Sequence, residues 1–503
     1  MVGKLIKLIN HHLPLVLLGL LVLRVGYLFI NGLDLVGDES YYWDWSRKPD
    51  WCYYSKPPMV AWLIGIFTWL GGDYTAMVRL PAVLLGTVFL GYFYATARAF
   101  YSPIAAAFAL LMILATPFNV IQNFIMTIDP PLYCFWMMSL YYLRRALFDG
   151  DQRAWLWAGL ATGAAVLSKQ SALLLPLMLI IFLLIRRERW PLFQRGFLVY
   201  LLPIIACLIP LFLWNQQHDW VMLGHSKGHF GNKEALDFFS RLANAGAFWL
   251  FQFLLATPIF FVLIVNIAVK NTLRFKQLRQ EEQFLMLMGP LLLLVILALS
   301  LVQKVQGNWP IPFYFTGLIL LAGHWDAGYR QKWLQNGLVV GYSMVAITYT
   351  LPLIISLFNL HNTAVDPTYR FRHWHELAAN IDTVRHQTSA DNAEQSFVIA
   401  LGHRYLASQL AFYLPDHPQV FRYEASGLVT SQYEVWPGPQ AYLGKTGFIV
   451  SEQNEAAIPS ELKSAFQIFK EVASIPNPMN KDARYYLYIG ENLKQWPPKA
   501  NKE

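Results

Sequence analysis

Apolar runs long enough to cross a lipid bilayer recur along the first 359 residues of the chain. A transmembrane helix needs about 20 mainly apolar residues, because no water inside the bilayer can satisfy an irregular backbone. Only 14% of the 503 residues are charged, against roughly a quarter in soluble globular proteins. We therefore predict an integral membrane protein. The expected spans lie near residues 13–33, 77–99, 103–117, 130–148, 154–168, 170–185, 196–214, 244–269, 284–303, 311–323 and 337–358.

The distribution of lysine and arginine predicts how the spans are oriented. Short cytoplasmic loops of membrane proteins carry an excess of these residues. In this chain they fall in alternate loops: Lys4, Lys7, Arg98, Arg144, Arg145, Arg153, Arg186, Arg187, Arg189, Lys270, Arg274, Lys276, Arg279, Arg330 and Lys332. We therefore expect a cytoplasmic amino terminus, with the loop 34–76 and everything after about residue 359 on the outer side. The same bias explains most of the net charge of +8, so no nucleic-acid partner is expected.

The composition of the chain changes near residue 360, where long apolar runs give way to charged residues and short strand-like segments. Strand-like segments that alternate with helix-like patterns indicate a small α/β domain. They lie at 397–401, 446–451 and 484–490. We therefore predict a polytopic α-helical membrane domain over residues 1–359, with about 11–13 transmembrane helices. A C-terminal α/β domain on the outer side is predicted over residues 360–503.

An acidic pair, Asp38 and Glu39, stands just outside the first span. Two interpretations of the pair are open. Its carboxylates can cap an amphipathic helix on the membrane surface, with the neighbouring aromatic residues as an interfacial belt. These aromatic residues are Tyr41, Tyr42, Trp43 and Trp45. Alternatively, the carboxylates take part in chemistry at this membrane face.

The same loop also contains a lysine and a short apolar stretch. Lys56 in Lys56-Pro57-Pro58 is either an interfacial lysine whose charged end reaches the water or a cation for an anionic substrate. The apolar stretch 59–72 is bounded by prolines and glycines and is too short to cross the bilayer. We expect an interfacial or re-entrant helix there.

Further charged residues stand inside the first span or at the outer ends of other spans. Arg24 lies within the first span, where a charge is costly, so it should face the bundle interior or a polar cavity. Asp129 in MTIDPPL fits a helix N-cap followed by proline at the first helical position, and it is also a candidate second acid. Three cations lie on the outer side against the topology rule, which favours a functional role for them: Arg79, Lys169 and Lys304.

An anionic substrate at the outer face would meet these carboxylates and cations together. We take Asp38 and Asp129 as the candidate catalytic acids. The candidate substrate-binding residues are Lys56, Glu39, Arg79, Lys169, Lys304, Tyr54, Asn308 and Trp309. His218 and His225 are weak candidate metal ligands, although a flexible polar loop also explains them, and the three cysteines show no zinc spacing. No cofactor is identified, and a divalent cation is left open.

The order of these motifs resembles that of the GT-C superfamily of membrane glycosyltransferases. The segment DESYYWDW after the first span is followed by YYSKPP, VRLPAV, TIDPPLY and QGNWPIPFYF. The resemblance covers roughly residues 10–320 and is closest to the bacterial lipid A aminoarabinose and lipid A/core galacturonic acid transferases. These are related to protein O-mannosyltransferases, and such proteins use a polyprenyl-phosphate sugar as donor.

The resemblance implies roles for individual residues. Asp38 would lie beside the acceptor as base or orienting group, Lys56 would contact the donor phosphate, and Asp129 would be the second acid. The chain departs from the pattern in one respect. The aminoarabinose enzymes place an arginine shortly after the acidic pair, where this chain has Ser40-Tyr41-Tyr42. Either another cation contacts the phosphate here, or the acceptor is different.

The resemblance also implies a function and a location. We expect a monomeric inverting glycosyltransferase of the bacterial inner membrane, which moves a sugar from polyprenyl (undecaprenyl) phosphate to a lipid A or lipopolysaccharide-core glycolipid at the periplasmic face. Two alternatives remain open, namely a protein O-glycosyltransferase with the same donor and a transporter or flippase of lipid-linked sugars. A transporter would predict paired broken helices or an internal repeat, and the sequence shows neither.

Overall fold

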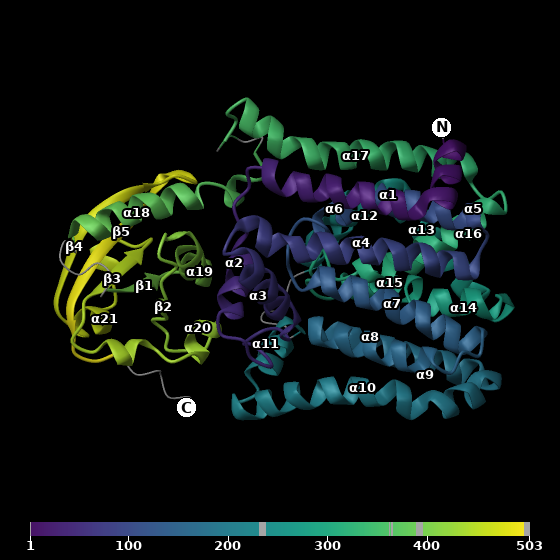
Figure 1. The fold of residues 1–503 in the computed structure, drawn as a ribbon, viewed down its shortest axis with the longest axis horizontal. Coiled ribbons are helices and arrows are strands. Elements are labelled where there is room, and N and C mark those ends of the chain that lie inside the picture. The colour runs from purple at the N-terminus through teal and green to yellow at the C-terminus, as the bar shows by residue number, and fades with distance from the viewer. Residues whose placement is uncertain (1, 231–237, 362, 364–365, 389–395, 497–503) are drawn as a thin grey trace.

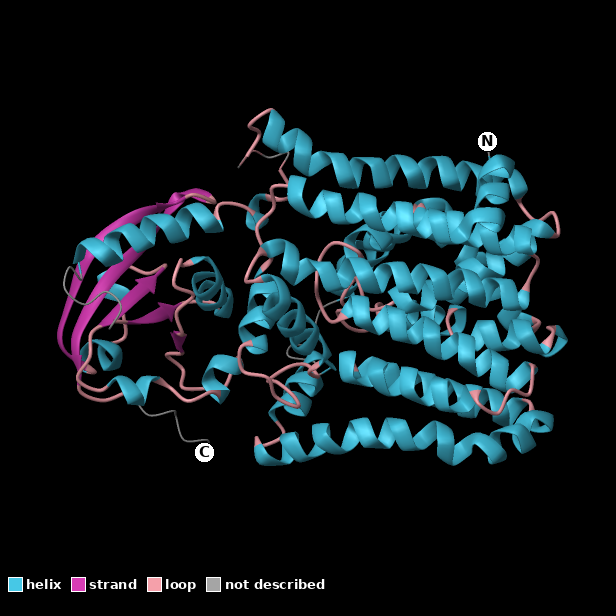
Figure 2. Ribbon diagram, viewed as in Figure 1, coloured by secondary structure: helices cyan, strands magenta, loops and turns pink. Residues whose placement is uncertain are grey.

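The structure consists of a helical bundle followed by a small domain built on a β-sheet (Figure 1, Figure 2). The computed structural model describes residues 2–230, 238–361, 363, 366–388 and 396–496. The bundle helices are α1 (Val2–Ile30), α4 (Thr75–Phe100), α5 (Pro103–Leu114), α6 (Pro117–Gln122), α7 (Asp129–Phe148), α8 (Ala154–Ser168), α9 (Leu174–Ile185), α10 (Trp190–Gln217), α12 (Phe238–Ala256), α13 (Pro258–Leu273), α14 (Gln280–Leu287), α15 (Pro290–Leu299), α16 (Ile311–Asp326) and α17 (Gln331–Leu357).

Long apolar helices confirm the prediction of a polytopic helical membrane protein. Among the described residues, five stretches are long and apolar enough to cross a membrane: Val2–Ile30, Thr75–Phe100, Arg187–Gln217, Gln280–Leu299 and Gln331–Leu357. Shorter apolar helices pack beside them. The amino terminus lies at the end of the bundle away from the sheet domain (Figure 1). Arg24 is 6% exposed, and its Nη1 donates to Asn123 Oδ1 at 2.8 Å, so the expected inward orientation is confirmed.

The predicted single span 244–269 is wrong, because the chain bends by 110° between α12 and α13. Pro258 has no amide hydrogen and cannot continue α12, so it stands in the first turn of α13 instead. Thr257 has a positive φ of 66°, and its Oγ1 caps α13 by accepting from the Phe260 amide. This is one broken helix among the described residues, not the pair that a transporter would predict.

The C-terminal domain contains a five-stranded mixed sheet in the order β2-β1-β3-β5-β4 (Figure 2). Strand β1 runs parallel to β2 and β3, whereas β5 is antiparallel to β3 and β4. Three strands were predicted, namely β1, β3 and β5. The missed strand β2 is only four residues long, and the missed strand β4 is mostly exposed or half-buried, so neither forms a clear apolar run. The elements are α18 (Trp374–Thr388), β1 (Phe397–Leu401), α19 (Arg404–Tyr413), β2 (Val420–Tyr423), α20 (Gln432–Val435), β3 (Gly447–Ser451), α21 (Ser460–Ser464), β4 (Phe466–Asn477) and β5 (Asn480–Leu493).

Two short helices lie between the bundle and the sheet domain (Figure 1). They are α2 (Gly37–Ser46) and α3 (Met59–Gly71), and the short helix α11 (Val221–Phe230) follows α10. The idea of an aromatic belt on α2 is wrong, because Tyr41, Tyr42, Trp43 and Trp45 are all buried. They share one apolar cluster with α3 and with the core of the sheet domain. Apolar packing between the two parts therefore holds α2 in place. The interfacial position of α3 in the membrane stays a prediction.

Candidate active site

A cavity of about 550 Å³ lies where the bundle meets the C-terminal domain. Its apolar side is formed by bundle residues such as Phe118, Ile125 and Phe251. Its polar side contains Asp38, Asp129, Thr127, Gln122 and Asn308 from the bundle region, and Arg370, Tyr405 and Gln409 from the chain after α17. The cavity thus brings together groups that are far apart in the sequence, and it can accept a molecule with an apolar part and a polar part.

Asp38 stands in the first turn of α2 and is 43% exposed. Its Oδ1 accepts a hydrogen bond of 2.9 Å from the Tyr405 hydroxyl, whereas no described residue donates to Oδ2. Gly37 makes this contact possible, because a Cβ there would lie 2.3 Å from the Tyr405 ring. Asp38 is therefore oriented by one oxygen and keeps the other available to a substrate.

Asp129 is held more completely than Asp38. Its Oδ1 accepts from Lys169 Nζ at 2.9 Å, and its Oδ2 accepts from Asn308 Nδ2 at 2.7 Å. The expected N-cap role is wrong, because Ile128 is the N-cap residue of α7 and Asp129 is the first helical residue. The side chain instead joins α7 to the end of α8 and to the turn before α16. Both members of the ion pair are 13% exposed.

Lys56 is partly buried beside these groups. The pKa of its ammonium is lowered to about 8, mainly by burial and then by the positive charge of Lys169, while the carboxylates of Asp129 and Asp38 oppose the shift. No described side chain forms a hydrogen bond or an ion pair with this ammonium. A partly desolvated cation without a close counter-ion favours the binding of an anion.

Glu39 and Arg79 form a buried ion pair, 0% and 1% exposed. Glu39 Oε2 accepts from Arg79 Nη2 at 2.8 Å and from the Val36 amide at 3.0 Å, and Oε1 accepts from the Met126 amide at 2.9 Å. Arg79 also donates to the carbonyls of Leu33 and Asp34. We therefore propose that this pair positions the segments of chain beside Asp38 and Asp129, in place of the direct substrate contact expected from the sequence.

The remaining candidates are not among the described residues that line the cavity. Lys304 is exposed, and the cavity lining given by the described residues does not include it. The Tyr54 hydroxyl contacts His225 Nδ1 at 3.3 Å, and His218 stacks on Trp214. Trp309 is partly buried against the bundle core. Within the described residues, no group of three or more His, Cys, Asp or Glu side chains could hold a metal ion.

Two residues of the site were missed in the sequence, Arg404 and Tyr405 at the start of α19. Tyr405 is 367 positions from the aspartate it contacts, and no spacing rule connects residues so far apart. The segment HRYLASQLAFYLP contains both residues, but its amphipathic pattern predicts only a helix.

Comparisons with known proteins indicate the fold and the class of enzyme. A family model described as dolichyl-phosphate-mannose-protein mannosyltransferase matches residues 55–214. The chain is 28% identical over 341 residues to the lipid A galacturonosyltransferase RgtD of Rhizobium johnstonii, covering 64% of this chain and 68% of RgtD. The crystal structure of ArnT from Cupriavidus metallidurans in the apo state superposes with a TM-score of 0.62 at 16% identity, over 94% of this chain and 97% of ArnT.

A second ArnT structure, bound to undecaprenyl phosphate, also gives a TM-score of 0.62, at 15% identity and with the same coverage. The ArnT similarity shows the fold, and the family model and RgtD show the class of enzyme. The resemblance predicted from the motifs is thereby confirmed.

Proposed function

We propose that this membrane glycosyltransferase of the GT-C type moves a sugar from a polyprenyl-phosphate donor to a glycolipid of the lipid A or core type. The proposal rests on two groups near a cavity that also has an apolar side. Asp38 has a carboxylate oxygen available to a substrate, and the Lys56 ammonium has no ion-pair partner among the described residues. The bound undecaprenyl phosphate of ArnT and the acceptor in the name of RgtD support the two substrates.

The proposed chemistry is a single displacement at the anomeric carbon. An acceptor oxygen forms the new bond to this carbon, and the bond between the carbon and the donor phosphate breaks. The electron pair leaves with the phosphate, and Asp38 takes the proton when the acceptor is a hydroxyl. A phosphate monoester is a good leaving group, so the site must mainly stabilise its charge. Fixed cations in a site that excludes water do this well, and Lys56 fits this role.

The other charged groups support the two reacting residues. Lys169 and Asn308 hold Asp129, whose charge in turn attracts the lysines on this side of the cavity. We propose that residues 1–359 form the catalytic membrane domain, that 34–76 is its periplasmic loop, and that 360–503 form a periplasmic α/β domain which closes the cavity. The protein is proposed to work as a monomer in the bacterial inner membrane.

The pH dependence of the reaction tests the role of Lys56. Its ammonium is charged below a pKa of about 8 and neutral above it, so kcat/KM for the donor should fall as the pH rises through about 8. In Lys56→Arg the guanidinium stays charged, so this alkaline decline should move to a higher pH. Initial rates between about pH 6 and 10 measure both profiles. Identical alkaline declines in the two proteins would remove Lys56 from the proposed phosphate site.

The orientation in the membrane is a separate prediction. The lysine and arginine bias requires a cytoplasmic amino terminus and a periplasmic sheet domain. Alkaline phosphatase fused after residue 360 should therefore be active, because this reporter folds only outside the cytoplasm. A fluorescent cytoplasmic reporter fused at the same point should stay dark. The reverse pattern would place the proposed site on the wrong membrane face.

The acceptor is tested by the envelope of a deletion strain. Mass spectrometry of its glycolipids should show the loss of one sugar from a lipid A or core species, restored by the wild-type chain and not by Asp38→Asn. The matching family model is described for protein mannosylation, so glycoproteins must be stained in the same strain. Lost glycoprotein staining with unchanged glycolipids would replace the glycolipid acceptor with a protein.

A further inference from the structure

We propose that Arg404 of the C-terminal domain binds the donor phosphate together with Lys56, so that this domain supplies a part of the active site. The inference rests on the proposed function and extends it to a residue outside the membrane domain. It is carried by the geometry of the Arg404 guanidinium, by the charges around it and by the contacts that fix the start of α19.

The guanidinium of Arg404 is fixed in place but mostly unused as a donor. Its Nη2 donates to the Tyr405 hydroxyl at 3.1 Å and lies 3.8 Å from Asp38 Oδ1. Its Nε is buried without a hydrogen-bond partner, and no described acceptor contacts Nη1. The group also lies 5.4 Å from the centre of the Tyr41 ring and 4.8 Å from that of Tyr405. An arginine held between two rings with free donors is well suited to a phosphate group.

The charges around Arg404 favour an anion at this point. Lys56 and Arg404 are close enough that the charge of Arg404 lowers the pKa of Lys56. Asp38 is nearest to Arg404, and Asp129 is already paired with Lys169. Lys56 has no ion-pair partner among the described residues, and Arg404 shares Asp38 with the Tyr405 hydroxyl. A phosphate between Lys56 and Arg404 would pair with both cations and would use the free donors of the guanidinium.

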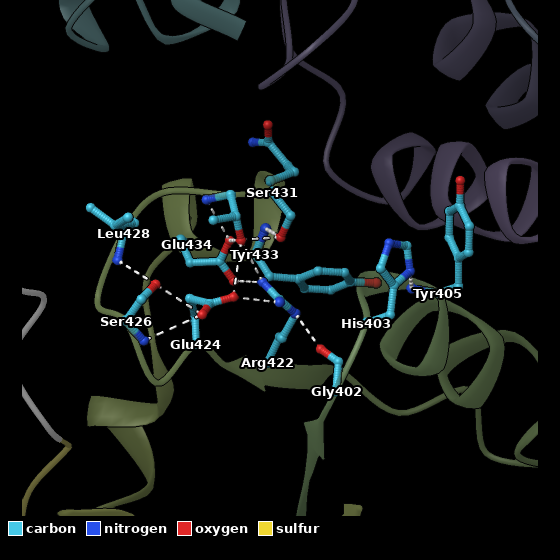
Figure 3. Close-up of polar contacts among 12 residues, drawn as sticks. Gly402, His403, Tyr405, Arg422, Glu424, Ser426, Leu428, Ser431, Tyr433 and Glu434 are labelled. Carbon is cyan, nitrogen blue, oxygen red and sulfur yellow. Dashed lines mark hydrogen bonds and ion pairs between the residues drawn. The ribbon is translucent and has the colours of Figure 1, made fainter. Parts of the chain in front are cut away.

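The start of α19 is fixed by a network of hydrogen bonds that Figure 3 shows. Arg422 Nε donates to the Gly402 carbonyl at 2.8 Å, while its terminal nitrogens bind Glu434 at 2.8 Å and Glu424 at 2.6 Å. His403 Nδ1 then caps α19 by accepting from the Tyr405 amide. These contacts place Arg404 before any substrate arrives, so little conformational entropy is lost on binding.

The interface between α2 and α19 sets the distance between Arg404 and Asp38. Ser40 Oγ and Ser408 Oγ are 2.8 Å apart, and Gln409 Nε2 donates to the Leu35 carbonyl at 2.8 Å. The chain has Ser40-Tyr41-Tyr42 after its acidic pair, with no arginine there. In the folded protein the ring of Tyr41 lies against a cation that comes from the other domain.

The test measures the binding of undecaprenyl phosphate to the purified full-length protein in nanodiscs. Arg404→Gln should weaken binding about 10- to 100-fold, because it removes charged hydrogen bonds to the phosphate. Arg404→Lys should show a smaller loss, since it keeps the charge without the planar donor pair. Arg484→Gln is the matched control, because Arg484 is exposed on β5 and its side chain donates, among the described residues, to Ser474 alone. This control should bind like the wild type.

A further variant separates direct binding from positioning. Tyr405→Phe loses the hydrogen bond to Asp38 and the one that the Tyr405 hydroxyl accepts from Arg404 Nη2, but it keeps the guanidinium and the ring beside it. It should therefore lower kcat and weaken undecaprenyl phosphate binding clearly less than Arg404→Gln does. Equal losses of binding in Tyr405→Phe and Arg404→Gln would mean that Arg404 acts only by positioning, which overturns the inference. An unchanged affinity in Arg404→Gln, with a raised KM for the glycolipid acceptor, would also overturn it.

The inference and the proposed function fail in different ways. If the wild-type protein does not bind undecaprenyl phosphate, the proposed donor is wrong. If the wild type binds and Arg404→Gln binds equally well, the donor stands and only the role of Arg404 is lost. Thermal unfolding of each variant excludes a loss of binding through misfolding.

Discussion

Replacing Asp38 with asparagine is expected to lower kcat about 100- to 10,000-fold, because a positioned base contributes about that factor to a reaction. The amide has nearly the same shape as the carboxylate, and its oxygen can still accept the Tyr405 hydrogen bond. The amide cannot, however, take a proton from the acceptor. The fold and the affinity for undecaprenyl phosphate should therefore stay close to those of the wild type. Initial rates with saturating donor and acceptor measure the change.

Asp129→Asn is the matched comparison, since it makes the same chemical change on the other side of the cavity. Both oxygens of Asp129 are already bound by Lys169 and Asn308, so this residue is a poor candidate for the base. Its loss should lower the rate less than the loss of Asp38, through a misplaced Lys169. A nearly normal rate in Asp38→Asn, together with an inactive Asp129→Asn, would reverse the assignment. Full activity in both would place the reaction elsewhere.

Glu39→Gln is expected to lower the free energy of unfolding by about 3–5 kcal/mol, because it leaves the buried charge of Arg79 without its partner. Both side chains of this pair are almost completely buried. The change also weakens the hydrogen bonds that Glu39 accepts from the amides of Val36 and Met126. These two bonds join the segment before α2 to the segment before α7. Unfolding in detergent, followed by tryptophan fluorescence, measures the loss.

A surface ion pair provides the control for this experiment. Lys470 and Glu491 pair across β4 and β5 at 2.9 Å, but they are 54% and 38% exposed. Exposed pairs contribute only about 0–1 kcal/mol, so Glu491→Gln should change the stability little. Equal effects of the two substitutions would show that the Glu39–Arg79 pair is not the buried anchor described above.

Much of the membrane fold was predictable because a bilayer restricts the backbone to a few solutions. Long apolar stretches predicted the helices. The break between α12 and α13 was not predicted, although Pro258 is a sequence signal for it, because the apolar run continues past this proline. The buried aromatic side chains of α2 were not predictable in the same way. Tyr41 and Trp43 look like interfacial residues until side chains of the C-terminal domain pack against them.

The candidate site was predictable as a set of residue types on one membrane face, but not as a geometry. The resemblance pointed to Asp38, Lys56 and Asp129. Asp38 and Asp129 line one cavity, and Lys56 lies close enough for their charges to act on its ammonium. Side-chain contacts between distant parts of the chain could not be predicted from the sequence. Glu39 binds Arg79, and Asp129 binds Asn308, which lies in a turn 179 positions away. The proposed role of Arg404 in the site depends on the docking of two domains, and such docking leaves no pattern in the local sequence.

Transfer of a labelled sugar by the purified protein tests the central claim most directly. The protein is reconstituted in vesicles with a polyprenyl-phosphate sugar labelled in the sugar and with a lipid A-type glycolipid. We expect the label to move to the glycolipid with release of polyprenyl phosphate, and we expect this transfer to be lost in Asp38→Asn. Label that crosses the membrane while still attached to polyprenyl phosphate, with none on the glycolipid, would contradict the account and indicate a flippase.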